Sequence, residues 1–241
     1  MELLKNITCQ IQANLSSKYY IRARYLFDLY SPLFAKSVNK NNYMDLGCGF
    51  GINSAVFGEE FRNVYCSDFS LTDLGTCREY MNGKENFYYI AADAQSLPFK
   101  NECFDLVTAF SLIEHVPGQE KMLREAYRIL KKKGEFVLQF PNKHFFMELH
   151  TGIPFYCLFP DFIKPWILEK VSYAGFIKIP TPEHVKKIIC EIDPSANVRV
   201  INVIYPDELV PARFKKVYSL LKKTGIFRKI PFGWLVIWEK Q

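Results

Sequence analysis

The segment from Tyr43 to Gly51 limits what this chain can fold into more than any other part of the sequence. It is an apolar run that ends on the acid Asp45, after which glycines stand at three alternate positions: Gly47, Gly49 and Gly51. Glycine allows backbone conformations with φ > 0 and lets a ligand approach the main chain closely. Because residues 52–60 can begin a helix, the segment predicts a strand, a tight turn and a helix whose first N–H groups point into the turn.

The spacing of the glycines narrows the kind of ligand. The pattern is G-x-G-x-G, and Ile52 occupies the sixth position, where the dinucleotide pattern G-x-G-x-x-G requires a small residue. A pyrophosphate uses all three glycines of that longer pattern, so the turn favours a ligand without phosphate groups. The preceding acid, Asp45, also suits a cationic ligand better than an anionic one. A glycine-rich turn that binds no ligand remains the alternative.

The length and charge of the chain narrow its class. Its 241 residues suffice for one sizeable domain with an insertion, and 49% of them are hydrophobic, which predicts a folded protein. The formal net charge of +6 is too small to indicate nucleic acid by itself. The basic excess lies toward the C-terminus, where it predicts either a solvated helix face or contact with an anionic membrane surface. It comprises Arg213, Lys215, Lys216, Lys222, Lys223, Arg228 and Lys229.

The seven cysteines are scattered and form no C-x-x-C pair. They therefore indicate neither a zinc site nor a disulfide framework. The first ten residues lack the apolar core of a signal peptide, and the sequence holds no run of about 18 apolar residues. We expect a cytoplasmic protein with reduced thiols, no metal and no transmembrane segment.

Apolar strands alternate with helical segments after the glycine turn. The predicted strands are 63–67, 86–91, 104–110 and 135–140, and the predicted helices are 71–81 and 119–130. The second helix is expected to end in a basic turn closed by Gly134. Short apolar strands imply burial on both faces, hence a mostly parallel sheet with helices on either side. We therefore predict an α/β protein with a doubly wound, Rossmann-like sheet that binds ligands at the carboxyl ends of its strands.

Further segments surround this core. Residues 1–40 have apolar positions at helical spacing and are expected to form an N-terminal helical lid, with residues 41–241 as the main domain. The run at about 141–180 is rich in aromatic residues and broken by prolines, which predicts an inserted cap over the carboxyl edge of the sheet. Thr181 and Pro182 then predict the start of a helix. Beyond them we expect strands at 197–205 and 234–238 and a helix at 208–223.

Three acids end the first three predicted strands. Asp45 ends the first, Asp68 the second and Asp93 the third. The Asp68 carboxylate can accept both hydroxyls of a ribose, one on each oxygen, although it could instead cap the helix that follows. Asp93 can accept an exocyclic amino group such as N6 of adenine, or it could simply form a turn. The recurrence of an acid at three strand ends favours a nucleoside-like ligand.

Several motifs together resemble the class I S-adenosylmethionine-dependent methyltransferases. The resemblance is to the small-molecule branch that includes ubiquinone-type methyltransferases, and it covers about residues 41–140 and the late strands. Its motifs are Asp45–Gly51, Asp68, Asp93–Phe99, Phe104–Val107, Glu114–Val116 and Ile129–Glu135. The resemblance implies a seven-stranded sheet whose last strand, near 234–238, is antiparallel, and S-adenosylmethionine as cofactor.

The resemblance also implies roles for the matching residues. The three glycines would surround the methionine part of the cofactor, and Asp45 would orient its amino group. Phe110 and Ser111 would line the methyl-donor end.

At the other end of the cofactor, the resemblance makes Asp68 the ribose ligand and places Phe69 on the adenine. Asp93 would bind N6 of the adenine, and the backbone of Ala94 would add a further bond.

The acceptor of the methyl group is less defined by the sequence. A hydroxyl acceptor needs a base, which predicts His115 or His150 in that role, although either could be an ordinary turn or surface residue. The aromatic residues of the 141–180 insertion favour a small-molecule acceptor that is apolar or lipid-linked, O-methylation and peripheral membrane contact. These rings could also serve only to pack the insertion onto the domain.

Other functions remain as alternatives. Residues 110–113 read Phe-Ser-Leu-Ile, unlike the Asn/Asp-Pro-Pro-aromatic motif of enzymes that methylate amino groups of nucleic-acid bases, so we expect no nucleic-acid partner. A nicotinamide-dependent dehydrogenase conflicts with Ile52 and with the extra acid Asp93. A non-catalytic, methyltransferase-like binding or regulatory protein is compatible with the sequence.

Overall fold

The computed structural model of the chain describes residues 18–34, 38–145, 159–160, 162–164, 166–167, 177–210 and 215–241. Its centre is a seven-stranded sheet with strand order β3-β2-β1-β4-β5-β7-β6, in which β7 runs antiparallel to both of its neighbours. The strands are β1 Asn42–Leu46, β2 Asn63–Asp68, β3 Phe87–Ala91, β4 Phe104–Phe110, β5 Leu130–Pro141, β6 Asn197–Val203 and β7 Gly233–Glu239. The predicted doubly wound, mostly parallel α/β fold is confirmed.

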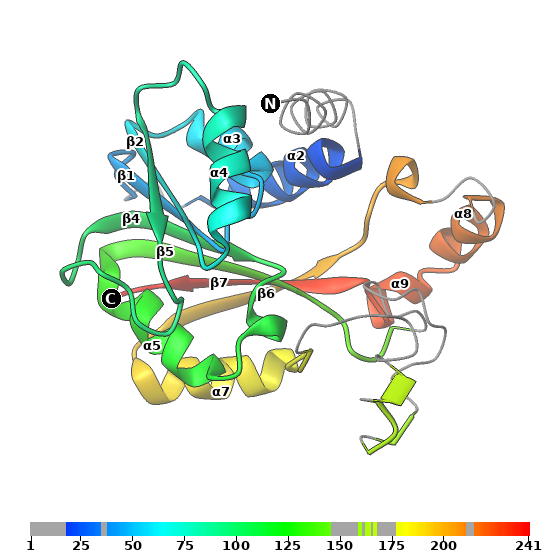
Figure 1. Cartoon of the computed structure of the whole chain (residues 1–241). Coiled ribbons are helices and arrows are strands. Elements are labelled where there is room, and N and C mark those ends of the chain that lie inside the picture. The colour runs from blue at the N-terminus through cyan, green and yellow to red at the C-terminus, as the bar shows by residue number, and fades with distance from the viewer. Residues whose placement is uncertain are drawn as a thin grey trace.

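Helices cover both faces of this sheet. Figure 1 shows α2, α3 and α4 on one face and α5 and α7 on the other. The α-helices are α2 Lys18–Tyr30, α3 Ile52–Gly58, α4 Leu71–Tyr80, α5 Gln119–Ile129, α7 Pro182–Ile192, α8 Lys215–Lys223 and α9 Ile226–Lys229. The short 3-10 helices are η1 Ser31–Leu33, η2 Ile113–His115 and η4 Asp207–Leu209.

Burial on two faces explains why the central strands read as continuous apolar runs. All seven residues of β4 are buried, and each face of the sheet has its own apolar cluster. On the α5 side, the fully buried Trp238 stacks on Tyr127 with ring centroids 5.1 Å apart. On the other side, Phe57 of α3 packs against Phe27 of α2 at 5.1 Å, which holds the N-terminal helix on the domain.

The predicted helix starts agree with the structure. The Ser70 hydroxyl caps α4 by accepting a hydrogen bond from the Asp73 N–H at 3.2 Å. Thr181 caps α7 by accepting from the His184 N–H at 3.2 Å, and Pro182 occupies the first turn. Such caps satisfy N–H groups that the helix itself leaves without a partner.

The predicted glycine stop at the end of α5 is wrong. The helix ends at Ile129, and the chain continues directly into the extended residue Leu130, where β5 begins. Lys133, and not Gly134, adopts the positive φ of 63° in this segment. Gly134 is needed for another reason, since a Cβ there would lie 2.9 Å from the Lys131 carbonyl oxygen.

The C-terminal segment differs from its prediction in detail. The predicted helix 208–223 is divided into the short η4 and the nine-residue α8. Helix α9 follows directly, and β7 begins at Gly233, which pairs with Pro141 at the end of β5. Helices α8 and α9 therefore lie at the carboxyl edge of the parallel strands (Figure 1).

Candidate functional site

The glycine turn after β1 has the backbone that its sequence predicts. Gly47, Gly49 and Gly51 have φ values of 73°, 51° and 82°, in the left-handed region that disfavours side chains. A Cβ on Gly47 would lie 2.7 Å from Leu112 Cδ1, and one on Gly51 would lie 2.4 Å from Cys77 Sγ. A Cβ on Gly49 would have no protein atom within 4 Å. Packing thus explains two of the glycines, whereas Gly49 borders open space that a ligand can fill.

Asp68 fastens this turn to the end of β2. Its Oδ2 accepts a hydrogen bond from the Gly49 N–H at 2.8 Å, and its Oδ1 accepts from the Ser70 N–H at 2.8 Å. The helix cap of α4 is Ser70, so the alternative role of Asp68 as that cap does not apply. Each carboxylate oxygen has a second lone pair available for a ligand hydroxyl. The next residue, Phe69, is 82% exposed beside it and offers an open apolar ring.

Asp93 lies on the segment that follows β3, next to Asp68 along the carboxyl edge. The Ala92 N–H donates to the Asp68 carbonyl oxygen at 3.1 Å, which brings the two strand ends together. The Asp93 carboxylate is exposed and accepts from the backbone and side-chain N–H groups of Gln95 at 2.9 and 3.1 Å. The next residue, Ala94, is buried. The predicted turn and the predicted ligand role of Asp93 are therefore compatible.

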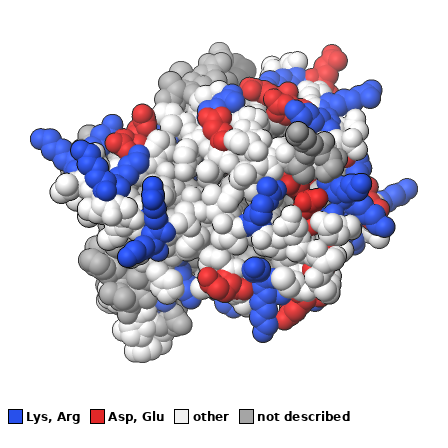
Figure 2. Space-filling view, turned by 180° about the vertical axis from the view of Figure 1, so that it is seen from behind, with Lys and Arg blue, Asp and Glu red and all other residues white. Residues whose placement is uncertain are grey.

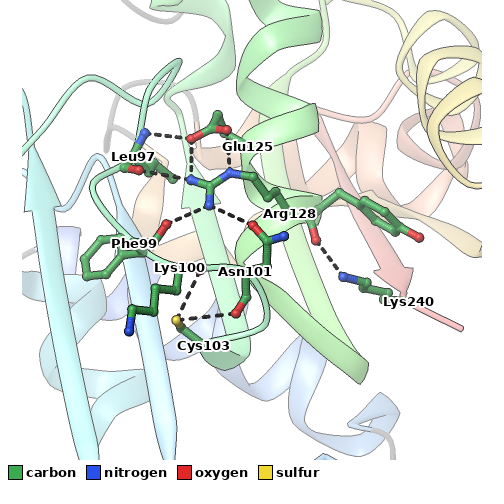
Figure 3. Close-up of polar contacts among 9 residues, drawn as sticks. Leu97, Phe99, Lys100, Asn101, Cys103, Glu125, Arg128 and Lys240 are labelled. Carbon is green, nitrogen blue, oxygen red and sulfur yellow. Dashed lines mark hydrogen bonds and ion pairs between the residues drawn. The ribbon is translucent and has the colours of Figure 1, made fainter.

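Helix α5 holds the loop beyond Asp93 in place, as Figure 3 shows. Arg128 donates to the carbonyl oxygens of Leu97 and Phe99 at 3.0 and 2.6 Å, and the Glu125 carboxylate accepts from the Leu97 N–H at 2.7 Å. The hydrogen bond from Arg128 keeps the pKa of Glu125 below its ordinary value. The Glu125–Arg128 ion pair therefore holds the backbone of the loop that follows Asp93.

Asp45 lies deeper than expected for a ligand-facing acid. It is buried, and its carboxylate accepts hydrogen bonds from the hydroxyls of Ser54 at 2.5 Å and Thr108 at 3.1 Å. Burial raises its pKa to about 7, because it disfavours the charged form, although the hydrogen bond from Ser54 opposes this effect. The structure therefore shows Asp45 joining α3 and β4 to the end of β1, and its predicted contact with a ligand amino group stays a prediction.

The raised pKa of Asp45 predicts a pH-dependent stability. The carboxyl ionises near pH 4 in the unfolded chain but near pH 7 in the folded one, so between these values the folded state binds more protons. The free energy of unfolding should therefore fall as the pH rises through this window. Relative to Asp45→Asn, we expect the wild type to lose on the order of 4 kcal/mol across the whole window. Urea denaturation of both proteins across the window measures this, and parallel pH curves would contradict it.

A polar cluster lies at the ends of β4 and β5. Ser111 has a positive φ of 51°, and its N–H donates to the Gln139 carbonyl oxygen at 2.8 Å. From α2, Arg22 Nη2 donates to Ser111 Oγ at 2.7 Å and also to Gln139 Oε1. Arg22 Nε donates to the Tyr205 hydroxyl at 3.0 Å. Neighbouring Phe110 is buried, so these polar groups form the surface of this strand end.

Arg22, Gln139 and Tyr205 were not identified from the sequence. They come from three distant segments, and Arg22 stands in an ordinary helical run beside Arg24. Burial alone would lower the pKa of Arg22, but the Tyr205 hydroxyl and the Glu114 carboxylate raise it above the ordinary value. The guanidinium is therefore firmly cationic at the carboxyl edge.

His115, one of the two predicted bases, ends η2 just beyond β4. It is half-buried, and its backbone N–H donates to the Leu112 carbonyl oxygen at 2.8 Å. The backbone N–H of Lys178 donates to the Glu114 carbonyl oxygen at 2.7 Å, so the end of the 141–180 insertion lies against η2. His150, the other predicted base, lies outside the described residues.

The beginning of the insertion lies against α9. Phe145 is buried, with its ring centroid 4.3 Å from that of Phe232 and 6.5 Å from that of Phe227. The insertion therefore leaves the domain beside α9 and returns beside η2. The described ends agree with a cap over the carboxyl edge, and most of the predicted cap lies outside the described residues.

Comparisons with known proteins find a methyltransferase domain in this chain. The sequence profile of the methyltransferase domain family matches residues 44–138. An uncharacterized protein from Methanocaldococcus jannaschii is 37% identical over 63% of this chain and 62% of its own length. A ubiquinone biosynthesis O-methyltransferase from Coxiella burnetii is 24% identical over 65% of this chain and 73% of its own length. The chain thus spans less than two thirds of the first of these relatives.

A solved structure shares the fold over most of the chain. The crystal structure of an S-adenosylmethionine-dependent methyltransferase from Mesorhizobium loti has a TM-score of 0.63 at 17% identity, and the match covers 87% of this chain and 95% of that one. The likeness shows the fold, and the matched residues 44–138 include the glycine turn and the acids at the strand ends. Residues 44–138 of this chain therefore match the methyltransferase domain family, within a chain whose fold is that of the Mesorhizobium loti structure.

Proposed function

We propose that this chain transfers a methyl group from S-adenosylmethionine to a small-molecule acceptor. The observation that carries the proposal is Gly49, which has a positive φ, open space in place of a side chain, and an N–H bound to Asp68. This cradle fits the methionine part of the cofactor, whose sulfonium group supplies an activated methyl. The ligand roles assigned above from the resemblance are part of this proposal.

The protein's share of the reaction is largely one of alignment. Methyl transfer is an in-line displacement, so holding donor and acceptor at the correct distance and angle supplies much of the rate. Asp68 and Asp93 would fix the nucleoside end through the fastened loops described above. Ser111, held by Arg22 and Gln139, would define the place where the acceptor approaches.

For a hydroxyl acceptor we assign the role of base to His115. It follows the end of β4, close in sequence to Ser111, and imidazole accepts a proton near neutral pH. His150 remains a second candidate on the insertion. In this scheme the acceptor hydroxyl loses its proton to the imidazole as its oxygen attacks the methyl carbon. His115→Asn would then lower kcat and remove the acidic limb of the pH–rate profile, whereas a role in shaping the turn would leave the profile unchanged.

The N-terminal helix is proposed to act as a lid over this site. Helix α2 contacts α3 at one end, through Phe27 and Phe57, and reaches the end of β6, where the Tyr25 hydroxyl donates to the Ile204 carbonyl oxygen at 2.8 Å. One turn before Tyr25 on the same helix, Arg22 bonds to Ser111 and Gln139 at the ends of β4 and β5. The helix thus lies on one face of the sheet, with Arg22 at the carboxyl edge and Tyr30 bonded to Glu135 toward the opposite edge.

We further propose that the acceptor is apolar or lipid-linked, with a polar reacting end. The 141–180 insertion begins beside α9 and ends beside η2, and its sequence is rich in aromatic residues. Arg22, Ser111 and Tyr205 supply the few polar groups that orient a ligand in such a pocket. A phenol on an apolar body combines both features, and the relative from Coxiella burnetii is described as acting in ubiquinone biosynthesis. None of the helices in the described part of the chain is long and apolar enough to span a membrane.

The experiment that tests the proposed function uses methyl-labelled S-adenosylmethionine and a total lipid extract in detergent. Label should enter the organic phase, and at a cofactor concentration near the wild-type Kd the Gly49→Ala protein should transfer much less. Label found only on small hydrophilic acceptors would contradict the proposal that the acceptor is apolar or lipid-linked. Absence of transfer to any fraction, despite cofactor binding, would instead support the non-catalytic alternative.

Asp93 is expected to determine which purine the site accepts. A carboxylate accepts hydrogen bonds only, so it binds the amino group of adenine and repels the carbonyl oxygen of an inosine analogue of the cofactor. Asp93→Ala should therefore reduce the discrimination between the two cofactors by about tenfold, the value of one charged hydrogen bond. Competition binding with both analogues measures this. If discrimination between the two cofactors were unchanged, a group other than Asp93 would recognise the purine base.

A further inference from the structure

The surface of α8 and α9 is the most basic part of the described chain near the carboxyl edge. We define the α8–α9 surface as Lys215–Ile230, a segment with six basic residues and no acid. The basic residues are Lys215, Lys216, Lys222, Lys223, Arg228 and Lys229. Figure 2 shows Lys and Arg side chains gathered on the lobe that projects at the left of the view.

Most of this charge is not neutralised by the protein. Lys222 pairs with Asp207 at 2.9 Å, but the other five basic residues form no ion pair within the part of the chain that the structure describes. An open groove of about 470 Å³ lies along α8, lined by Asp207, Lys215, Lys216, Ser219, Leu220 and Lys223. The groove therefore offers three ammonium groups and a hydroxyl to an anionic ligand.

Apolar side chains are exposed among these lysines. Leu220 is 66% exposed and Val217 58%, while Ile226 and Ile230 on and after α9 are about two fifths exposed. The inner side of the same helices has its own core, in which Tyr218 and Phe227 are buried and stack at 4.9 Å. A solvated face would not need aliphatic residues on its outer side, so this surface combines charge with an apolar contact.

The position of this surface connects it to the candidate site. Helix α9 precedes β7, whose Gly233 pairs with Pro141 at the end of β5. The start of the 141–180 insertion packs on α9 through Phe145 and Phe227. A partner bound to the α8–α9 surface would therefore lie beside the carboxyl edge at which the methyl group is transferred.

We propose that the α8–α9 surface binds the anionic face of a lipid bilayer. The lysines contact lipid phosphates, and Val217, Leu220, Ile226 and Ile230 enter the boundary between headgroups and acyl chains. The exposed aliphatic residues favour a bilayer over nucleic acid, since a phosphate backbone offers them no apolar contact. The inference rests on the proposed function in one respect: binding would present a lipid-linked acceptor to the site.

Co-sedimentation of the full chain with vesicles tests the proposal. The chain should bind vesicles of mixed phosphatidylglycerol and phosphatidylcholine, bind pure phosphatidylcholine much more weakly, and release as salt is raised. Lys216→Glu with Lys223→Glu should reduce partitioning about 25-fold or more, since each basic residue near an anionic surface contributes about fivefold. Leu220→Ser should weaken binding without changing its salt dependence.

The matched control reverses two exposed lysines on another helix, Lys186 and Lys187 of α7. This protein should bind vesicles more tightly than the α8 double variant. Equal losses in the two double variants, or equal binding to both lipid mixtures, would overturn the proposal. So would loss of duplex DNA binding in the α8 variant in the absence of vesicle binding.

Calorimetry with S-adenosylmethionine separates this proposal from the proposed function. The α8 double variant should bind the cofactor like the wild type, because Lys216 and Lys223 are exposed on the α8–α9 surface and take no part in the glycine turn. A chain that binds vesicles but not the cofactor would refute the proposed function and leave the lipid surface intact.

Discussion

Gly49→Ala should remove most of the affinity for S-adenosylmethionine while leaving the fold in place. Gly49 has a φ of 51°, and a Cβ built there meets no protein atom within 4 Å, so the new methyl group would occupy only ligand space. Forcing a methyl group into a filled contact costs about 1–3 kcal/mol, which corresponds to a loss of roughly 5- to 150-fold in affinity. Isothermal titration calorimetry measures the change.

The chain offers a matched control in Gly83. It also has a positive φ, of 87°, and open space at its Cβ position, but it lies in the turn after α4. Gly83→Ala should therefore suffer a similar backbone strain, about 1–3 kcal/mol, and yet bind the cofactor like the wild type. Equal cofactor affinity in the two variants would show that Gly49 does not border the ligand.

Asp68→Ala should weaken cofactor binding by more than tenfold. Its carboxylate would lose charge-assisted hydrogen bonds to the ribose, which are worth roughly 1.5–3 kcal/mol each. The same substitution removes the acceptor of the Gly49 and Ser70 N–H groups, so the glycine turn loses its attachment to β2. Both effects act in the same direction. Calorimetry with S-adenosylmethionine gives the affinity, and a thermal melt shows how much of the loss is due to stability.

Two further variants make this test specific. Asp68→Asn keeps an oxygen acceptor but not the charge, so its affinity should lie between those of Asp68→Ala and the wild type. Asp28→Ala removes an exposed carboxylate from α2 and should have no effect. Unchanged affinity in Asp68→Ala would refute the assignment of this residue to the cofactor.

The parts of the fold that the sequence predicted are those determined by local rules. Short apolar and aromatic runs between helical segments identified β2, β3 and β4 nearly to the residue. In β4 the run is continuous because all seven residues are buried, on both faces of the sheet. The helix start at Thr181 and Pro182 was predictable because a capping hydroxyl followed by proline favours a first helical turn. The acids at the strand ends were predictable because parallel strands place their carboxyl ends at one edge.

The parts that were missed depend on contacts between distant segments. Gly134 reads as a helix stop, yet it is required by close backbone contacts, and the helix ends earlier because Leu130 already pairs with Phe104 of β4. Arg22 meets Gln139 only because α2 packs on the sheet with this end of the helix at the carboxyl edge. The deep burial of Asp45 follows from packing of α3 on β4, which no local pattern reports.

Calorimetric titration of the wild-type chain with S-adenosylmethionine and, separately, with NAD tests the central claim most directly. The G-x-G-x-G turn and the acids at the ends of β2 and β3 predict saturable binding of S-adenosylmethionine at one site and no heat with NAD. Saturable binding of NAD, with none of S-adenosylmethionine, would contradict the account.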